Sequence, residues 1–153
     1  MAPTRPNKKP KEAFLSHSSK NSAFANRLAK SLTSHNISTF YSKKHIVGAQ
    51  EWHDEIGAAL KRCNWFLLVL SPEAVKSKWV KHELIYALQQ NRYKGRIVPL
   101  VYKSCDINTL SWTLSGFQHI DFQKGFHRGF QELLRIWKIE FVSKPAQKES
   151  KRK

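Results

Sequence analysis

The sequence predicts an α/β protein, a single domain built on a flavodoxin-like parallel five-stranded sheet with helices on both faces. Three observations support this. Short apolar runs alternate five times with helical stripes, an order typical of parallel strands joined by crossover helices. The run Trp65–Leu70 contains no polar residue, as expected of a central strand that is covered on both sides. The 153 residues, 41% of them hydrophobic, are enough for one full core.

The first half of the chain predicts two strands and two helices. The apolar run Glu12–His17 ends in the polar cluster Ser18–Asn21, which predicts a strand followed by a helix cap. Apolar residues then recur at helical spacing, at Phe24, Leu28 and Leu32. Ile37–Tyr41 is β-branched and aromatic and predicts the second strand. Polar Ser42–Gln50 predicts a loop. The apolar face of the next helix comprises Trp52, Ile56, Ala59, Leu60 and Cys63.

The second half adds three strands, the first of them Trp65–Leu70. A helical region starts at Ser71–Pro72–Glu73, which offers a capping hydroxyl, a proline where no N–H is required and a carboxylate near the positive end of the helix dipole. Arg96–Val101 predicts the fourth strand, with Pro99 at a strand end or bulge because proline cannot donate to a ladder. His119–Phe122 predicts a short fifth strand, whereas residues 102–117 show no clear period. The two helical stripes are Val80, Leu84, Ala87 and Leu88, then Phe126, Phe130, Leu133, Leu134 and Trp137.

Charge divides the chain into a domain and two tails. There are 27 Lys and Arg residues against 11 Asp and Glu residues, a formal charge of +16. Half of it lies in residues 1–11 and 144–153, which have few apolar residues, so we predict flexible basic tails around a domain over residues 12–143. Such tails attract nucleic-acid phosphates, but they contain no aromatic residues for base stacking, so solubility or docking to a partner is the favoured interpretation.

Several kinds of chemistry lack their sequence signatures. No GxGxxG, P-loop, HExxH, CxxC or GxSxG pattern occurs, which argues against the corresponding nucleotide, metal and serine-nucleophile sites. We therefore predict no metal and no cofactor. Cys63 and Cys105 indicate two reduced thiols. No apolar run approaches the roughly 20 residues that span a bilayer, and no secretory signal is visible, so we expect a cytoplasmic protein.

Parallel sheets of this kind bind ligands at the carboxyl ends of their strands. In this chain those ends are residues 16–20, 42–50 and Ser71 onward. On the helix that follows, Trp79 and Glu83 are four residues apart and share a face beside the Val80 and Leu84 stripe. By spacing alone, a charged residue in such a place indicates a solvated helix face rather than a catalytic group.

Three segments, in the right order, resemble the TIR (Toll/interleukin-1 receptor homology) domain. EAFLSHSSKNSAFANRLAKSL at residues 12–32 is similar to the first box of that family. GAQEWHDEIGAALKRCNW at 48–65 resembles the end of its long loop and the helix behind it. FLLVLSPEAVKSKWVKHEL at 66–84 resembles its central strand and next helix, with the Trp-x-x-x-Glu signature at Trp79 and Glu83. The resemblance covers about residues 12–140 and is strongest to prokaryotic-type NAD-cleaving members.

The resemblance implies an activity and a site. Many TIR domains cleave the bond between nicotinamide and ribose in NAD+, and the glutamate of the signature is their catalytic residue, a role that falls here to Glu83. Nicotinamide is a cationic leaving group, so its departure needs no proton donor and one carboxylate suffices. The products would be nicotinamide and ADP-ribose or a cyclic ADP-ribose, with NAD+ as substrate rather than cofactor. Implied substrate contacts are Trp79, Trp52, Ser16, Ser18 and Ser42.

Two classes of function remain open. The first is an NAD+-cleaving enzyme in immune or anti-phage defence signalling, activated when copies associate through the Ser42–Gln50 loop. The second is a non-catalytic TIR interaction module, a scaffold that recruits other TIR or sensor proteins. Turnover of NAD+ that depends on Glu83 distinguishes them.

Overall fold

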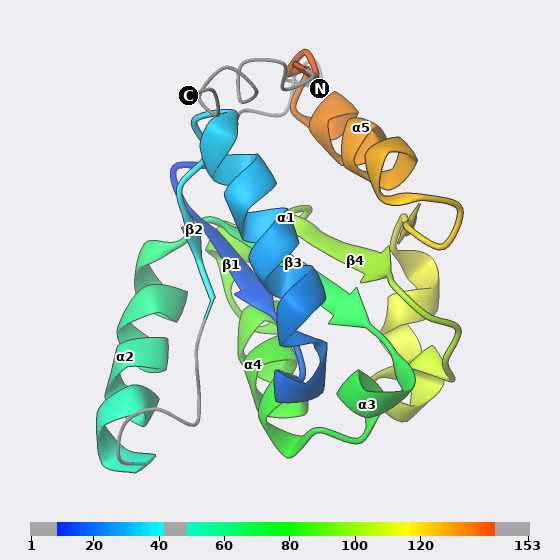
Figure 1. Cartoon of the computed structure of the whole chain (residues 1–153). Coiled ribbons are helices and arrows are strands. Elements are labelled where there is room, and N and C mark those ends of the chain that lie inside the picture. Colours follow the sequence, from blue (N-terminus) through cyan, green and yellow to red (C-terminus); the bar gives the residue numbers. More distant parts are fainter. Residues whose placement is uncertain (1–8, 42–48, 143–153) are drawn as a thin grey trace, which may run out of the picture.

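The computed structural model describes residues 9–41 and 49–142, with the side chains of 49–52 excepted. Its strands are β1 (Ala13–Ser16), β2 (Thr39–Phe40), β3 (Trp65–Leu70), β4 (Ile97–Val101) and β5 (Ile120–Asp121). Its helices are α1 (Ser22–Ser34), α2 (Ala49–Arg62), α3 (Pro72–Val75), α4 (Lys78–Leu88) and α5 (Phe126–Ile136) (Figure 1). Short 3-10 helices are η1 (Ser19–Asn21), η2 (Asn91–Tyr93), η3 (Ile107–Thr109) and η4 (Trp112–Gly116).

The strands form one parallel sheet in the order β2-β1-β3-β4-β5, so the predicted α/β fold is confirmed. β3 has the predicted bounds and lies at the centre of the sheet, with every side chain buried. β2 and β5 are shorter than predicted, at two residues each, because only these residues pair with their neighbours.

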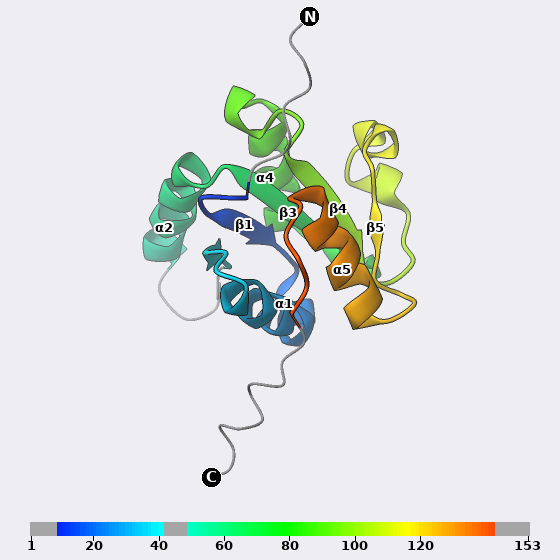
Figure 2. The same ribbon diagram turned by 90° about the horizontal axis from the view of Figure 1, so that it is seen from above.

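Alternate side chains of the strands enter two separate cores, one on each face of the sheet. α1 and α5 cover one face, and α2 and α4 cover the other (Figure 2). In β1, Leu15 belongs to the α1 and α5 core, whereas Phe14 belongs to the α2 and α4 core. Side chains two residues apart share a face, so Ser16 follows Phe14 on the side of α2 and α4.

The helical region after Ser71 is two helices rather than one. The Ser71 hydroxyl caps α3 by accepting from the Ala74 N–H at 3.0 Å, and α3 ends at Val75. The Ser77 hydroxyl then caps α4 by accepting from the Val80 N–H at 3.2 Å. A second capping serine thus starts a separate helix, α4, which packs against β1.

Two other sequence-based expectations need correction. Ala49 and Gln50 were predicted as loop but form the first residues of α2, while the rest of that loop, 42–48, lies outside the described residues.

Pro99 was predicted at a strand end or bulge but lies inside β4 opposite Leu68. Backbone hydrogen bonds show which residues of this segment face β3. Arg96 O accepts from Phe66 N–H, and Tyr102 N–H donates to Leu70 O, so the even-numbered residues point their N–H and C=O groups toward β3. The missing Pro99 N–H therefore faces away from β3, where β5 has not yet begun to pair.

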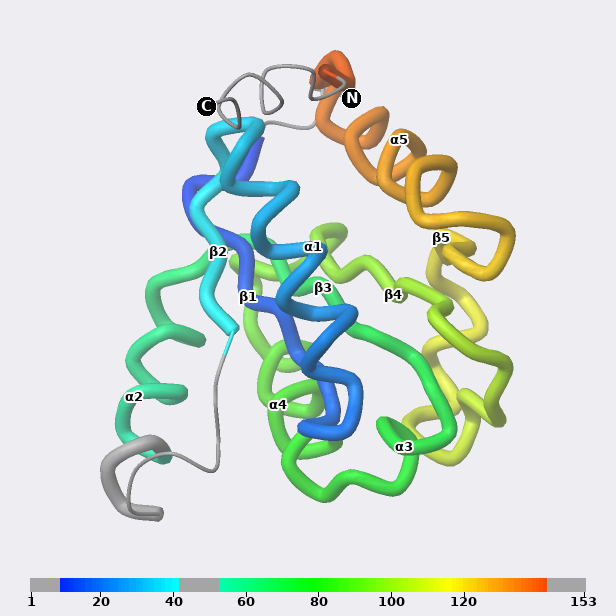
Figure 3. The backbone as a smooth tube through the Cα atoms, in the orientation of Figure 1, coloured from blue at the N-terminus to red at the C-terminus, as the bar shows by residue number. Residues whose placement is uncertain are grey.

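Residues 102–117, which had no clear period, contain η3 and η4 beside β4 and β5 (Figure 3). Side-chain caps start both turns: Asp106 accepts from the Asn108 N–H, and Ser111 accepts from the Thr113 N–H. Short turns of this kind are set by caps rather than by an apolar stripe, so hydrophobic periodicity does not reveal them.

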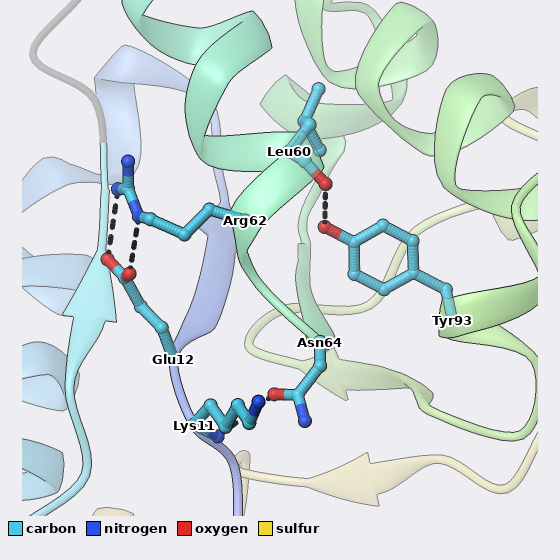
Figure 4. Close-up of polar contacts among 6 residues, drawn as sticks. All are labelled: Lys11, Glu12, Leu60, Arg62, Asn64 and Tyr93. Carbon is cyan, nitrogen blue, oxygen red and sulfur yellow. Dashed lines mark hydrogen bonds and ion pairs between the residues drawn. The ribbon is translucent and has the colours of Figure 1, made fainter.

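Polar contacts fix the carboxyl end of α2 against the sheet and η2 (Figure 4). Arg62 forms a two-point ion pair with Glu12, with Nε 2.6 Å from Oε1, and the Tyr93 hydroxyl donates to Leu60 O at 2.6 Å. The Lys11 N–H donates to the Asn64 side chain, so this part of the predicted 1–11 tail contacts the domain. The remaining tail residues, 1–8 and 144–153, lie outside the described part of the chain.

Candidate functional site

A cavity of about 380 Å³ lies between α2 and α4. That volume is typical of pockets for small organic ligands. α2 contributes His53, Ile56, Gly57, Leu60 and Lys61, and α4 contributes Trp79, His82, Glu83 and Tyr86. The Trp79 and Glu83 pair singled out by its spacing therefore faces a cavity, with both residues on its wall.

Glu83 is a buried carboxylate with a hydrogen bond from the sheet. Its side chain is 2% exposed, and the Ser16 hydroxyl donates to Oε1 at 2.7 Å. The expectation of a solvated face is thus wrong for Glu83. A buried charge is costly without such a partner, and Ser16 supplies one from the carboxyl end of β1. Two predicted site residues that are 67 positions apart in sequence are joined directly.

Trp79 forms an aromatic wall of the cavity together with two histidines. Its indole makes edge contacts with His53 on α2, at 5.6 Å between ring centroids, and with His82 on α4, at 5.9 Å. The contact with His53 connects α4 to α2, and the contact with His82 lies within α4. The indole is half-buried.

Sequence reasoning missed several wall residues that a regular spacing could have found. His53, Gly57 and Lys61 repeat every four residues beside the apolar face of α2, and His82 and Tyr86 do the same on α4. Residues at this spacing form a continuous strip on a helix. Two such strips facing each other make the cavity, but their pairing depends on how the helices pack.

The other predicted contacts do not all reach this cavity. The Ser18 hydroxyl accepts from the Lys20 N–H at 3.2 Å and caps η1, so its position is explained by local structure. Ser42 lies outside the described residues. Trp52 belongs to α2 one residue before His53, but its side chain is not among those described.

The crevice between the ends of β1 and β3, a usual ligand position in this fold class, is occupied by protein side chains. The Ser71 hydroxyl donates to Asn21 Oδ1 at 2.6 Å, and the Asn21 amide donates to Glu73 at 3.5 Å. A hydrogen bond from its own backbone N–H, together with the one from Asn21, lowers the pKa of the Glu73 carboxyl. None of these three residues is among the residues that line the cavity between α2 and α4.

A larger hollow of about 770 Å³ lies near the start of β3 and β4, lined by Trp65, Ile97, Phe117, Glu132 and Arg135 among others. These residues are at the amino end of the strands, away from Glu83, and the described lining of the hollow includes neither a predicted site residue nor a buried carboxylate.

Within 9–41 and 49–142, no three His, Cys, Asp or Glu side chains group as a metal site requires. No helix in the same ranges is long and apolar enough to cross a bilayer.

Comparisons with known proteins agree with this architecture. The family profile described as TIR domain matches residues 13–134. No curated protein matches the chain. The TIR domain of the Toll-related receptor TRR-2 from Hydra magnipapillata has a TM-score of 0.65 at 19% identity, covering 80% of this chain and 94% of that one.

Two further solved structures share the fold. The TIR domains of the activated Roq1 resistosome, which recognises the pathogen effector XopQ, have a TM-score of 0.64 at 15% identity, covering 81% of this chain and 97% of that one. A prokaryotic SEFIR domain has a TM-score of 0.60 at 10% identity, covering 83% and 98%. These likenesses show the fold, and the profile match over most of the chain shows the family. The chain belongs to the TIR-domain family.

Proposed function

We propose that this protein cleaves the nicotinamide–ribose bond of NAD+ with Glu83 as its catalytic residue, acting in immune or anti-phage defence signalling. The observation that carries the proposal is the place of Glu83: a carboxylate held by Ser16 on the wall of a cavity between two helices, next to an indole. The products are nicotinamide and ADP-ribose or its cyclic form.

The chemistry needs one well-placed carboxylate. As the C–N bond breaks, neutral nicotinamide leaves with the bonding electrons and positive charge develops on the ribose ring. Glu83 accepts hydrogen bonds from the ribose hydroxyls and stabilises that charge through space, an interaction that a low-dielectric site strengthens. Water or a group of the substrate itself then attacks the sugar carbon.

The other cavity residues suit a dinucleotide. Trp79 and Tyr86 offer aromatic surfaces for a planar base, and the apolar residues Ile56 and Leu60 limit access of water. Lys61, a cation among the described wall residues, attracts the diphosphate of the substrate. Trp52 and Ser42 stay proposed contacts on the strength of the family resemblance.

Access to Glu83 requires a change from the conformation described. At 2% exposure the carboxylate is too covered to meet a ribose, so the site must open at Glu83 before reaction. We propose that self-association of the domain through the Ser42–Gln50 loop produces this opening. The Roq1 relative, whose TIR domains are part of an activated resistosome, supports an assembly-dependent site.

The test is nicotinamide release from NAD+ by concentrated protein, measured for the wild type and for Glu83→Gln. Loss of a group that stabilises charge in the transition state should reduce kcat by at least about 100-fold. Glu55→Gln removes an exposed carboxylate on α2 that does not line the cavity, and it should retain wild-type activity. Activity that survives in Glu83→Gln overturns the catalytic role.

A non-catalytic scaffold that recruits other TIR proteins is the second candidate, and the burial of Glu83 favours it. A carboxylate so covered also fits a purely structural role in joining α4 to β1. This candidate predicts concentration-dependent assembly without NAD+ turnover, even when copies are forced together by a fused oligomer. It also predicts that loop variants, rather than Glu83→Gln, abolish function.

A further inference from the structure

We propose that Ser16 is a positioning residue for Glu83, holding the carboxylate ionised and in one orientation, rather than a contact for substrate. This inference uses the proposed role of Glu83 for its functional meaning. The contact itself stands on geometry and is testable whether or not NAD+ is cleaved.

Ser16 is held on a strand that pairs with the centre of the sheet. It is the last residue of β1 and pairs with Leu68 of the central strand β3. Its side chain is 1% exposed on the face covered by α2 and α4, where α4 packs on β1. A short side chain on a paired strand has little freedom, so the hydroxyl has a well-defined place from which to donate.

The hydroxyl is committed to Glu83. It donates its hydrogen to Oε1 at 2.7 Å, the usual length of a good O–H···O bond. Ser16 does not line the cavity, whereas Glu83 does. A carboxylate has two oxygens and several lone pairs. Holding Oε1 from the sheet therefore fixes the orientation in which the carboxylate would meet a ligand hydroxyl once the site has opened.

The electrostatic consequence concerns the ionised form of Glu83. Burial disfavours a charged carboxylate, and a hydrogen bond donated to it has the opposite effect. Among the described residues, the other charged or titratable side chains that line the cavity are His53 and Lys61 from α2 and His82 and Tyr86 from α4. They act across the cavity, while Ser16 is the donor from the sheet. Removal of the Ser16 hydroxyl should thus raise the pKa of the Glu83 carboxyl.

The direct test is a carboxyl NMR titration of protein labelled with ¹³Cδ-glutamate, in which Glu83→Gln assigns the signal. Ser16→Ala should raise the Glu83 midpoint by about one pH unit relative to wild type. Ser16→Thr retains the hydroxyl and should restore the midpoint. Ser16→Cys keeps nearly the same volume with a weak donor, so it should shift the midpoint upward if Ser16→Ala does not fold.

Ser71→Ala is the matched control. Ser71 is as buried as Ser16, follows the neighbouring strand and donates to the Asn21 amide at 2.6 Å. Because Ser71 also caps α3, its loss should reduce stability at least as much, and it should leave the Glu83 midpoint in place. An unchanged midpoint in both Ser16→Ala and Ser16→Cys, or an equal shift in Ser71→Ala, overturns the proposal.

Kinetics separate positioning from substrate contact. With NAD+ turnover present, Ser16→Ala should lower kcat about tenfold with little change in KM, and should move the acidic limb of the kcat profile to higher pH. A rise in KM at unchanged kcat would instead assign Ser16 to the substrate. If the wild type releases no nicotinamide, the proposed function fails, and the NMR midpoints still decide the role of Ser16.

Discussion

Cys63 lies just beyond the end of α2 and is fully buried, and this burial raises the pKa of its thiol to about 12. An unfolded chain ionises the same thiol near its ordinary value of 9.0. Below that pH both states keep the proton. Above it the unfolded state loses the proton first and is favoured, so the free energy of unfolding should fall as pH rises from about 9 toward about 12.

Urea unfolding at intervals from pH 8 upward measures this effect. Cys63→Ala should show a shallower fall of stability above pH 9 than the wild type, because the titrating group is gone. Cys105, a half-buried thiol, supplies the control: Cys105→Ala should keep more of the wild-type fall. Equal slopes in wild type and Cys63→Ala would contradict the assignment to Cys63.

The burial of Glu83 could not be predicted from the residues of its own helix. The spacing of Trp79 and Glu83 indicates a shared face, and in the structure both residues line one cavity. Spacing could not indicate that Glu83 is buried, because burial depends on α2 and β1, which lie far away in sequence. The same pair on an isolated helix would be solvated.

At the scale of elements, two helix glycines should respond oppositely to the same substitution. A Cβ on Gly129 of α5 would lie 2.7 Å from the Phe122 ring. That ring packs at 5.3 Å from Phe24 and 5.6 Å from Phe126, so it has little room to move. Gly129→Ala should therefore lower the free energy of unfolding by about 1–3 kcal/mol.

Gly57 on α2 is the matched control, since a Cβ there would meet nothing within 4 Å. Gly57→Ala should raise the free energy of unfolding by about 0.5–1 kcal/mol through the better helix propensity of alanine. Chemical denaturation of both variants gives the comparison. Stabilisation by Gly129→Ala would mean that α5 moves away from β5 more easily than the packing indicates.

The elements themselves were largely predictable. β3 was predicted residue for residue because its six apolar residues have no other plausible state in an α/β chain. The break between α3 and α4 was missed because Ser77 continues a helical pattern unless its capping bond to Val80 is known. Pro99 was misplaced because its acceptability inside β4 depends on which neighbour its missing N–H faces.

At the scale of the whole molecule, charge should make assembly and substrate binding respond oppositely to salt. The chain carries +16, so copies repel one another while an anionic dinucleotide is attracted. Raising ionic strength from about 0.05 M to about 0.3 M shortens the screening length from about 14 Å to about 6 Å, which weakens both interactions. At fixed, low protein concentration, kcat per chain should rise with salt, and KM for NAD+ should rise as well.

Steady-state nicotinamide release over a matrix of salt and protein concentrations measures both effects. Inhibition by added nicotinamide is the control, because an uncharged ligand should bind with the same constant at each salt concentration. A rate strictly proportional to protein concentration at every salt level would show that assembly does not activate the proposed NAD+ cleavage.

By itself, the sequence determined the α/β class, the order of strands and helices, the paired Trp79 and Glu83 signature and the resemblance that the family match later bore out. These are encoded locally, in periodicity, caps and motifs. The tertiary structure decided that Ser16 touches Glu83 and that α2 and α4 enclose a cavity around them. Such contacts depend on which strands are neighbours and which faces the helices cover. These are outcomes of packing the whole chain, which no local pattern specifies.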